Sequence, residues 1–268
     1  MPVLALALAA TLTTLDRWFV LPPESTKLPA HHVLHETTFG KGVPILNRMV
    51  LAAVDKVQAT QPDGGGYFIG ITATPAESPI GYPLAFLGTK LLDPPRTTSY
   101  CSGSSYGVLI EALNMALANS PANLTVDQIE SMRMQEPSGG RREDRVKFWG
   151  WWNADGPGSN YALVQYARIG DRVKPEDALP GDFLNINWKS GLGHSVVFLG
   201  WAINASNQKC LMYWSSQKRT DGFADDLAPI ASVKDVVFTR LTHPERLKDF
   251  TIKQSVDPNV TGDLISWP

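Results

Sequence analysis

The chain has 268 residues, of which 43% are hydrophobic, and it can therefore bury a substantial core without a metal or disulfide support. Its formal net charge of -2 lacks the strongly basic footprint of proteins that bind nucleic acids. Two cysteines are too few for a disulfide framework, and no apolar run is long enough to span a bilayer. We therefore expect neither a nucleic-acid partner nor a transmembrane span.

The first residues form a short apolar run in which Ala-x-Ala occurs twice, at Ala5, Ala7 and Ala9. This pattern is typical of an export signal, although the basic n-region of such signals is lacking. We interpret residues 1–40 as an N-terminal segment that is either a signal or an extension, and an ordinary buried helix or strand remains an alternative. If this segment is a signal, the protein is secreted or periplasmic.

Helical spacing dominates the first half of the remaining chain. Apolar residues recur at this spacing from Ile45 to Val57, and again after Cys101 up to Leu117. Thr125 and Gln128 match a capping box, which predicts the start of another helix. A short helix is expected between 159 and 170.

The period changes in the second half. The stretches FLNINW, HSVVFLGW, CLMYW and DVVFTRL predict β-strands with short connections, and hence an antiparallel sheet. Helices followed by strands indicate an α+β architecture. We expect one catalytic domain over 41–268, with an insertion around 119–170 that carries a Trp-rich stretch.

Cys101 is placed at the predicted start of a helix, where the backbone N–H groups and the helix dipole favour negative charge. Both effects stabilise a thiolate, which is the nucleophilic form of cysteine. The same N–H groups can hold an oxyanion as it develops. Cys101 is therefore a candidate nucleophile, with a buried structural cysteine as the alternative.

A thiol nucleophile needs a base, and His194 is the best placed of the five histidines. It follows a glycine turn and begins an apolar strand. A histidine at the exposed end of a hairpin is the alternative. If the two residues form a pair, Cys101 Sγ and a ring nitrogen of His194 should lie within a few ångströms of each other.

The two segments together resemble the NlpC-like cell-wall peptidases, a branch of the papain-like cysteine hydrolases that is related to the CHAP amidases. The resemblance rests on Cys101-Ser102-Gly103, Pro180-Gly181-Asp182 and the stretch from His194 to Gly200, in that order. It implies a papain-like fold with the cysteine at a helix N-terminus packed on the sheet. It also implies cysteine-dependent hydrolysis of an amide bond in a peptide or peptidoglycan-type substrate, with no metal and no cofactor.

The resemblance also implies a third polar residue that orients the imidazole, supplied by the following strand. Gln217 and Ser215 share one face of that strand by alternation, and Gln217 is favoured because its carbonyl oxygen can accept from an imidazole N–H. Tyr100 occupies the position where many members of the family carry an aspartate that grips a substrate amine.

Further candidates for substrate contact come from the neighbourhood of the nucleophile and from the insertion. These residues are Tyr100, Ser102, Trp149 and Trp152. The tryptophans could stack on a sugar or a peptide, whereas a Trp-rich satellite core is the alternative.

Two competing interpretations remain open. The scaffold could be a catalytically inactive binding module. Residues 103–107, GSSYG, match a nucleophile elbow, which would make Ser105 the nucleophile of a serine esterase with Asp226 or Asp235 and His243. The preceding residues are polar and proline-rich, which disfavours the buried strand that such an elbow requires.

Two histidines and the second cysteine are the remaining candidates for a metal site or a disulfide. His31 and His35 are four residues apart but lack a third metal ligand, and we expect them on a solvated loop. Cys210 is interpreted as a buried strand residue. A Cys101–Cys210 disulfide stays open for an exported protein, and it would block the proposed nucleophile.

Overall fold

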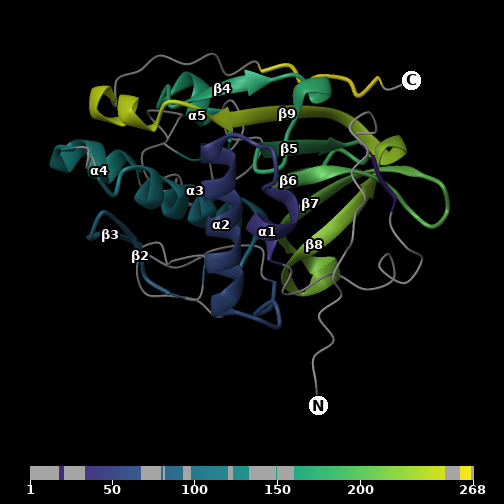
Figure 1. Cartoon of the computed structure of the whole chain (residues 1–268), viewed down its shortest axis with the longest axis horizontal. Helices are drawn as coiled ribbons and strands as arrows, with labels where there is room; N and C mark the ends of the chain where they lie inside the picture. Colours follow the sequence, from purple (N-terminus) through teal and green to yellow (C-terminus); the bar gives the residue numbers. More distant parts are fainter. Residues whose placement is uncertain are drawn as a thin grey trace.

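The computed structural model describes residues 18–20, 34–67, 80, 82–92, 98–119, 123–132, 149, 160–250 and 260–266. In chain order the elements are β1 Trp18–Val20, α1 His35–Phe39, α2 Ile45–Thr60, β2 Leu84–Phe86, β3 Thr89–Leu92, α3 Cys101–Ala116, α4 Val126–Met132, α5 Ala162–Gln165, β4 Gly170–Val173, η3 Pro175–Asp177, β5 Phe183–Trp188, β6 Gly193–Ile203, β7 Lys209–Gln217, η4 Lys218–Thr220, β8 Gly222–Pro229, η5 Ile230–Ser232, β9 Val233–Leu241 and η6 Pro244–Asp249. The protein is a mixed α+β structure, as its sequence predicts. In Figure 1, α3 and α4 lie to the left, α2 runs down the middle and β5 to β8 lie to the right.

Local sequence signals set the ends of two helices. Helix α3 begins at Cys101, the residue from which the sequence predicts it. The capping box before α4 is confirmed: the Thr125 N–H donates to Gln128 Oε1 at 2.8 Å, and the Gln128 N–H donates to Thr125 Oγ1 at 3.2 Å. No helix in the part of the chain that the structure describes is long and apolar enough to cross a membrane.

The main sheet has the strand order β4-β9-β5-β6-β7-β8, and each neighbouring pair in this path is antiparallel. The short strand β1 departs from this pattern, because it pairs in parallel with Trp201 to Ile203 of β6. It can do so because β5 pairs only with the first part of β6, up to Val197. A separate two-stranded sheet joins β2 and β3.

Each face of the main sheet has its own core, as strand alternation requires. On one face, Val197 and Leu199 of β6 pack with α2 and α3 in the larger cluster. On the other face, Val196 and Phe198 pack with side chains from β4, β5, β7, β8 and β9. We call these the helix face and the inner face. The inner face is covered mainly by side chains of the sheet itself, which shows that the sheet is strongly curved.

Strands β6 and β7 separate at one end. Their pairing stops at Val197 and Trp214, yet β6 continues with β5 as far as Gly193, and β7 continues with β8 as far as Gln217. The backbone of Ser195 therefore has no strand partner on the β7 side. Because buried backbone groups need hydrogen-bond partners, another part of the chain must satisfy them. The N-terminus of α3, which packs against both strands, lies in this split.

The Pro180-Gly181-Asp182 turn fixes the start of β5 against α2 and β9. Gly181 has a φ of +89°, and a Cβ there would come within 2.5 Å of the Asn47 carbonyl oxygen, so only glycine fits. Asp182 is fully buried and accepts hydrogen bonds from Asn47 at 2.8 Å and from Arg240 at 2.7 Å. Burial raises the pKa of this carboxyl, and these hydrogen bonds oppose the rise. The turn therefore has a structural role in this protein.

The expectation that His35 lies on a solvated loop is wrong, while His31 falls outside the described residues. His35 is the first residue of α1 and is 0% exposed. Its Nδ1 lies 2.7 Å from Asp55 of α2, and its Nε2 lies 2.6 Å from Asp225 of β8. This Asp–His–Asp cluster joins α1 to α2 and β8.

Candidate functional site

Cys101 lies at the split between β6 and β7, at the first position of α3. The residue before it, Tyr100, is in extended conformation and gives the helix no side-chain cap. The N–H groups of the first turn are therefore not satisfied by a capping side chain. The backbone N–H groups of Ser195 and Ser102 act on Cys101 Sγ as donors that favour its thiolate. The sulfur thus takes the place that a strand carbonyl would occupy beside Ser195.

The ionisation of this thiol depends on two opposed effects. Cys101 is only 8% exposed, and burial raises the pKa of its thiol. The nearby backbone N–H groups favour the thiolate and lower the pKa, but they do not offset burial completely. In the unliganded protein the thiol is therefore protonated at neutral pH, and a base must take its proton during reaction.

His194 belongs to β6 and directly precedes the residue that binds the sulfur. Its side chain is on the inner face, where the Trp188 ring stacks on it at 6.5 Å between centroids and the Tyr213 ring meets it edge-on at 5.5 Å. Burial lowers the pKa of His194 to about 4, opposed by the side chain of Gln217. The imidazole is therefore neutral at pH 7, which is the form that can act as a base.

The Ser195 N–H points along the plane of the sheet, so the sulfur that it binds also lies near this plane, between the two faces. A group in that position can be reached from the inner face, on which the His194 ring lies. The first turn of α3 and the start of β6 lie together, because Ser195 Oγ donates to Ser105 Oγ. The predicted approach of Cys101 Sγ to a ring nitrogen of His194, and the catalytic roles of the two residues, stay predictions.

Of the two candidates for the orienting residue, the structure brings Gln217 to His194. Gln217 is the last residue of β7, and its side chain acts on the imidazole beyond the point where the β6–β7 pairing ends. Its Nε2 donates to Thr220 Oγ1 at 2.8 Å, which turns Oε1 towards other partners. Within the described residues, Gln217 Oε1 and His194 Nε2 each lack a well-aligned hydrogen bond, although the amide is close enough to raise the pKa of the imidazole.

Ser215 does not contact His194. Its hydroxyl donates to the carbonyl oxygen of Ser195 at 2.8 Å and lies 3.4 Å from Ser104 Oγ. It therefore fills the split between the strands from the β7 side. Strand alternation predicts both candidates on one face of β7. It does not reveal that β6 and β7 separate here, where the Ser215 hydroxyl bonds the Ser195 carbonyl oxygen.

Three aromatic residues near the site were not identified in the sequence. The pKa of the Tyr67 and Tyr213 phenols is raised, mainly by burial. The negative charge of an ionised Cys101 adds to the rise, so both phenols lie within electrostatic range of the sulfur. Tyr67 reaches the site because it forms a bridge with Ser99. Trp188 could have been found from the hairpin, since its register places Ile186 opposite His194 and so puts Trp188 on the same face.

The residues predicted to contact substrate are mostly buried. Tyr100 is 6% exposed and packs in the core of the helix face, so its ring is covered in this structure. Ser102 is buried as well, and its carbonyl oxygen accepts from Trp149 Nε1 at 3.0 Å. Trp149 is 0% exposed and packs against Tyr106 and Phe183, which fits a core residue rather than a stacking platform. Trp152 lies outside the described residues.

Ser105 does not occupy a nucleophile elbow. It lies inside α3, one turn after Cys101, and is fully buried. Its hydroxyl donates to the Cys101 carbonyl oxygen at 3.0 Å and accepts from Ser195. The partners proposed for it are engaged elsewhere: Asp226 with Arg219, Asp235 with Asn187 and His243 with Glu245.

The two cysteines are both free, so the disulfide left open by the sequence is absent from the structure. Cys210 is a buried residue of β7, as expected. Among the described residues, no group of three or more His, Cys, Asp or Glu side chains is arranged to hold a metal ion.

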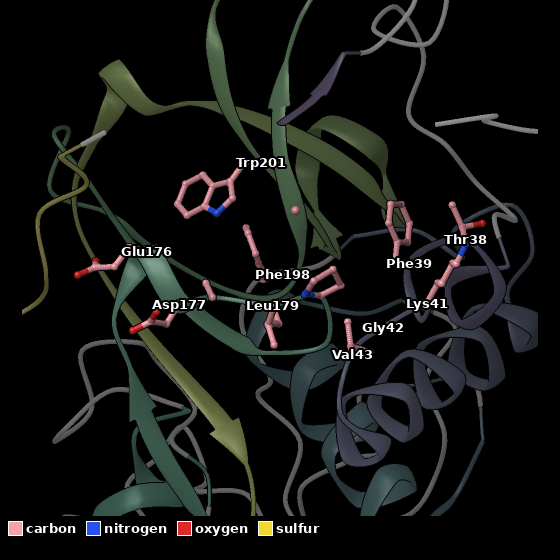
Figure 2. Close-up of a pocket in the computed structure, with 13 residues that line it drawn as sticks. Thr38, Phe39, Lys41, Gly42, Val43, Glu176, Asp177, Leu179, Phe198 and Trp201 are labelled. Carbon is pink, nitrogen blue, oxygen red and sulfur yellow. The ribbon is translucent and has the colours of Figure 1, made fainter. Parts of the chain in front are cut away.

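A cavity of about 360 Å³ lies away from these residues, between the α1–α2 connection, the turn that follows η3 and the far part of β6. Figure 2 shows Phe198 and Trp201 of β6 on one wall, with Phe39 and Val43 across from them. None of the predicted site residues lines this cavity. It is separate from the Cys101–His194 site.

No family model matches this sequence, and neither a curated protein nor a solved structure is significantly similar to it.

Proposed function

We propose that the protein is a cysteine-dependent amide hydrolase, with Cys101 as nucleophile, His194 as general base and Gln217 as the residue that orients the imidazole. The observation that carries the proposal is the environment of Cys101 Sγ, which sits at a helix N-terminus beside the backbone N–H groups of Ser102 and Ser195. Ser195 is the residue that follows His194. A structural cysteine in a core needs neither these donors nor a neighbouring imidazole.

The geometry supports a mechanism that begins from a neutral pair. When substrate binds, neutral His194 takes the thiol proton as Cys101 Sγ attacks the carbonyl carbon of the amide. The N–H groups at the start of α3 stabilise the resulting oxyanion. The imidazolium then gives its proton to the leaving amine, and a water deprotonated by His194 hydrolyses the thioester, which releases the acid and restores the thiol.

The cell-wall peptide bond is the substrate class that we propose, on the strength of the sequence resemblance. This activity fits a secreted or periplasmic protein. A second candidate, an inactive binding module, draws its support from the burial of Cys101 and His194, each 8% exposed. Turnover separates the two candidates.

The test is digestion of purified peptidoglycan sacculi, followed by mass spectrometry of the soluble fragments. The proposal expects fragments with a newly freed amine and acid at one amide bond, at a rate that falls when Cys101 is alkylated. The Cys210→Ala variant serves as the control, because it keeps the site and removes the other thiol. If active and alkylated protein release the same fragments, the proposal fails.

Replacing Gln217 tests its orienting role. Gln217→Met keeps the side-chain length but removes the carbonyl oxygen, and we expect kcat to fall by roughly ten- to a hundredfold, less than for loss of the nucleophile. Because the amide raises the pKa of His194, its loss should also move the acid limb of the kcat/KM profile to lower pH.

The Gln217→Glu variant provides the matched comparison. It keeps an acceptor beside the imidazole and adds a negative charge, which favours the imidazolium. The acid limb should therefore move to higher pH, opposite to Gln217→Met. If both variants shift the limb in the same direction, or neither shifts it, Gln217 does not act on His194.

A further inference from the structure

Four fully buried serines surround the N-terminus of α3. Ser104 and Ser105 belong to α3, Ser195 to β6 and Ser215 to β7. They lie where β6 and β7 separate, so no backbone ladder joins the strands at this level. The residues that hold this junction together are therefore side chains.

The four hydroxyls and two carbonyl oxygens lie in a ring. Four of its contacts are hydrogen bonds, and the fifth is an approach of the Ser104 and Ser215 hydroxyls, each of which already donates to a carbonyl oxygen. Ser104 and Ser105 both donate to the carbonyl oxygen of Cys101, at 2.8 and 3.0 Å. Ser195 Oγ donates to Ser105 Oγ at 3.2 Å. Ser215 Oγ donates to the Ser195 carbonyl oxygen at 2.8 Å, and 3.4 Å separates it from Ser104 Oγ.

Ser195 is the residue that connects this ring to the thiol. All three of its polar groups are used: the hydroxyl binds Ser105, the carbonyl oxygen binds Ser215, and the backbone N–H binds Cys101 Sγ. The first two contacts hold the residue from both sides. Its N–H is thereby fixed in direction, although no neighbouring strand pairs with it there.

We propose that Ser195 is a positioning residue, whose hydroxyl, held by Ser105, keeps its own backbone N–H on the sulfur of Cys101. The inference rests on Cys101 being the reactive thiol of the proposed function. Hydrogen bonds weaken steeply with distance and misalignment, so a small movement of β6 against α3 would weaken this contact. The serine ring supplies the alignment that a strand ladder supplies elsewhere in the sheet.

The test measures alkylation of Cys101 by iodoacetamide as a function of pH, resolved by mass spectrometry because Cys210 is also a free thiol. In Ser195→Ala the midpoint of the alkylation profile should move to higher pH, and alkylation at pH 7 should slow by roughly three- to tenfold. Ser105→Ala should act in the same direction. The double variant should be no worse than Ser105→Ala, because Ser105→Ala already removes the Ser195–Ser105 bond together with the bond from Ser105 to the Cys101 carbonyl oxygen.

Ser216→Ala is the matched control. Ser216 is also fully buried on β7 and accepts from Ser99 Oγ at 2.6 Å, but it is outside the ring. The titratable groups that sense the charge of the thiol are Tyr67 and Tyr213, and His194 precedes Ser195 in β6; all variants retain these three residues. A difference between Ser195→Ala and Ser216→Ala therefore reports on the ring.

The inference is overturned if Ser195→Ala and Ser216→Ala have the same midpoint as the wild type. Circular dichroism and thermal unfolding establish that each variant is folded, and if Ser195→Ala does not fold, Ser105→Ala alone decides. The readout needs no substrate. A protein that shows the expected midpoints but releases no fragment from sacculi would overturn the proposed function and leave the role of Ser195 intact.

Discussion

Replacing Cys101 with alanine is expected to lower kcat for amide hydrolysis by at least about a thousandfold, because no other group can form the acyl intermediate. His194→Ala should cost a similar factor, since the buried thiol stays protonated without a base. Loss of either member disables the same step, so the double variant should be no slower than the single ones. Steady-state kinetics on the released fragments measures all three.

The fold should tolerate the Cys101→Ala change, because the substitution removes a single sulfur atom from the first position of α3. Cys210→Ala is the comparison, as it removes a thiol that is 0% exposed and lies near the start of β7, at the end of the strand opposite to Gln217. It should retain activity while losing some stability. Residual turnover of Cys101→Ala above one tenth of wild type would contradict a nucleophilic role for Cys101.

Replacing His35 with glutamine is expected to destabilise the fold by about 3–5 kcal/mol, because it leaves the buried carboxylate of Asp225 and the partly buried carboxylate of Asp55 without their cation. His35 donates from both ring nitrogens, to Asp55 at 2.7 Å and to Asp225 at 2.6 Å, so it is an imidazolium. The cluster joins α1, α2 and β8, and its loss should loosen all three. Urea unfolding of wild type and variant at pH 6 measures the difference.

The pH dependence of this stabilisation has a defined sign. Burial alone lowers the pKa of His35, but the hydrogen bonds and charges of Asp225 and Asp55 outweigh it and raise the pKa to about 9, from an ordinary value of 6.5. The folded protein therefore binds this proton more tightly than the unfolded chain. The stabilisation is complete below about pH 6.5 and is lost as the pH rises through about 9.

The control is His243→Gln. His243 is partly exposed and lies 3.3 Å from Glu245, an arrangement typical of surface pairs that contribute less than about 1 kcal/mol. Between pH 6.5 and 9, the wild type and His243→Gln should lose stability in parallel, while His35→Gln changes little. Equal pH dependence in all three proteins would show that His35 is not the group responsible.

Much of the fold follows from the local sequence. The apolar spacing after Cys101 and the Thr125–Gln128 capping box act within a few residues, so their elements appear where the sequence predicts them. Strand alternation likewise sets which residues of β6 face α3. The strand order and the parallel pairing of β1 depend on contacts between distant segments, which no local pattern specifies.

The candidate site also has some features that the local sequence predicts and others that depend on the tertiary structure. The sequence alone identified Cys101 at a helix start and His194 at a strand start, because both positions are set by local turn and helix signals. Alternation places Gln217 and Ser215 on one face, so the sequence favoured Gln217 only on the chemistry of its amide. The separation of β6 from β7 decides between them, and this separation results from the packing of α3 into the sheet.

The sequence by itself determined which residue types stand at the ends of elements, where a thiol and an imidazole are chemically useful. Only the tertiary structure decided that His35 is a buried cation between two carboxylates, that Trp149 belongs to the core, and that Ser195 binds the sulfur through its backbone. Burial and hydrogen-bond partners depend on residues far apart in the chain, such as His35 and Asp225. Local periodicity carries no information about such pairs, and they exist only once the chain has folded.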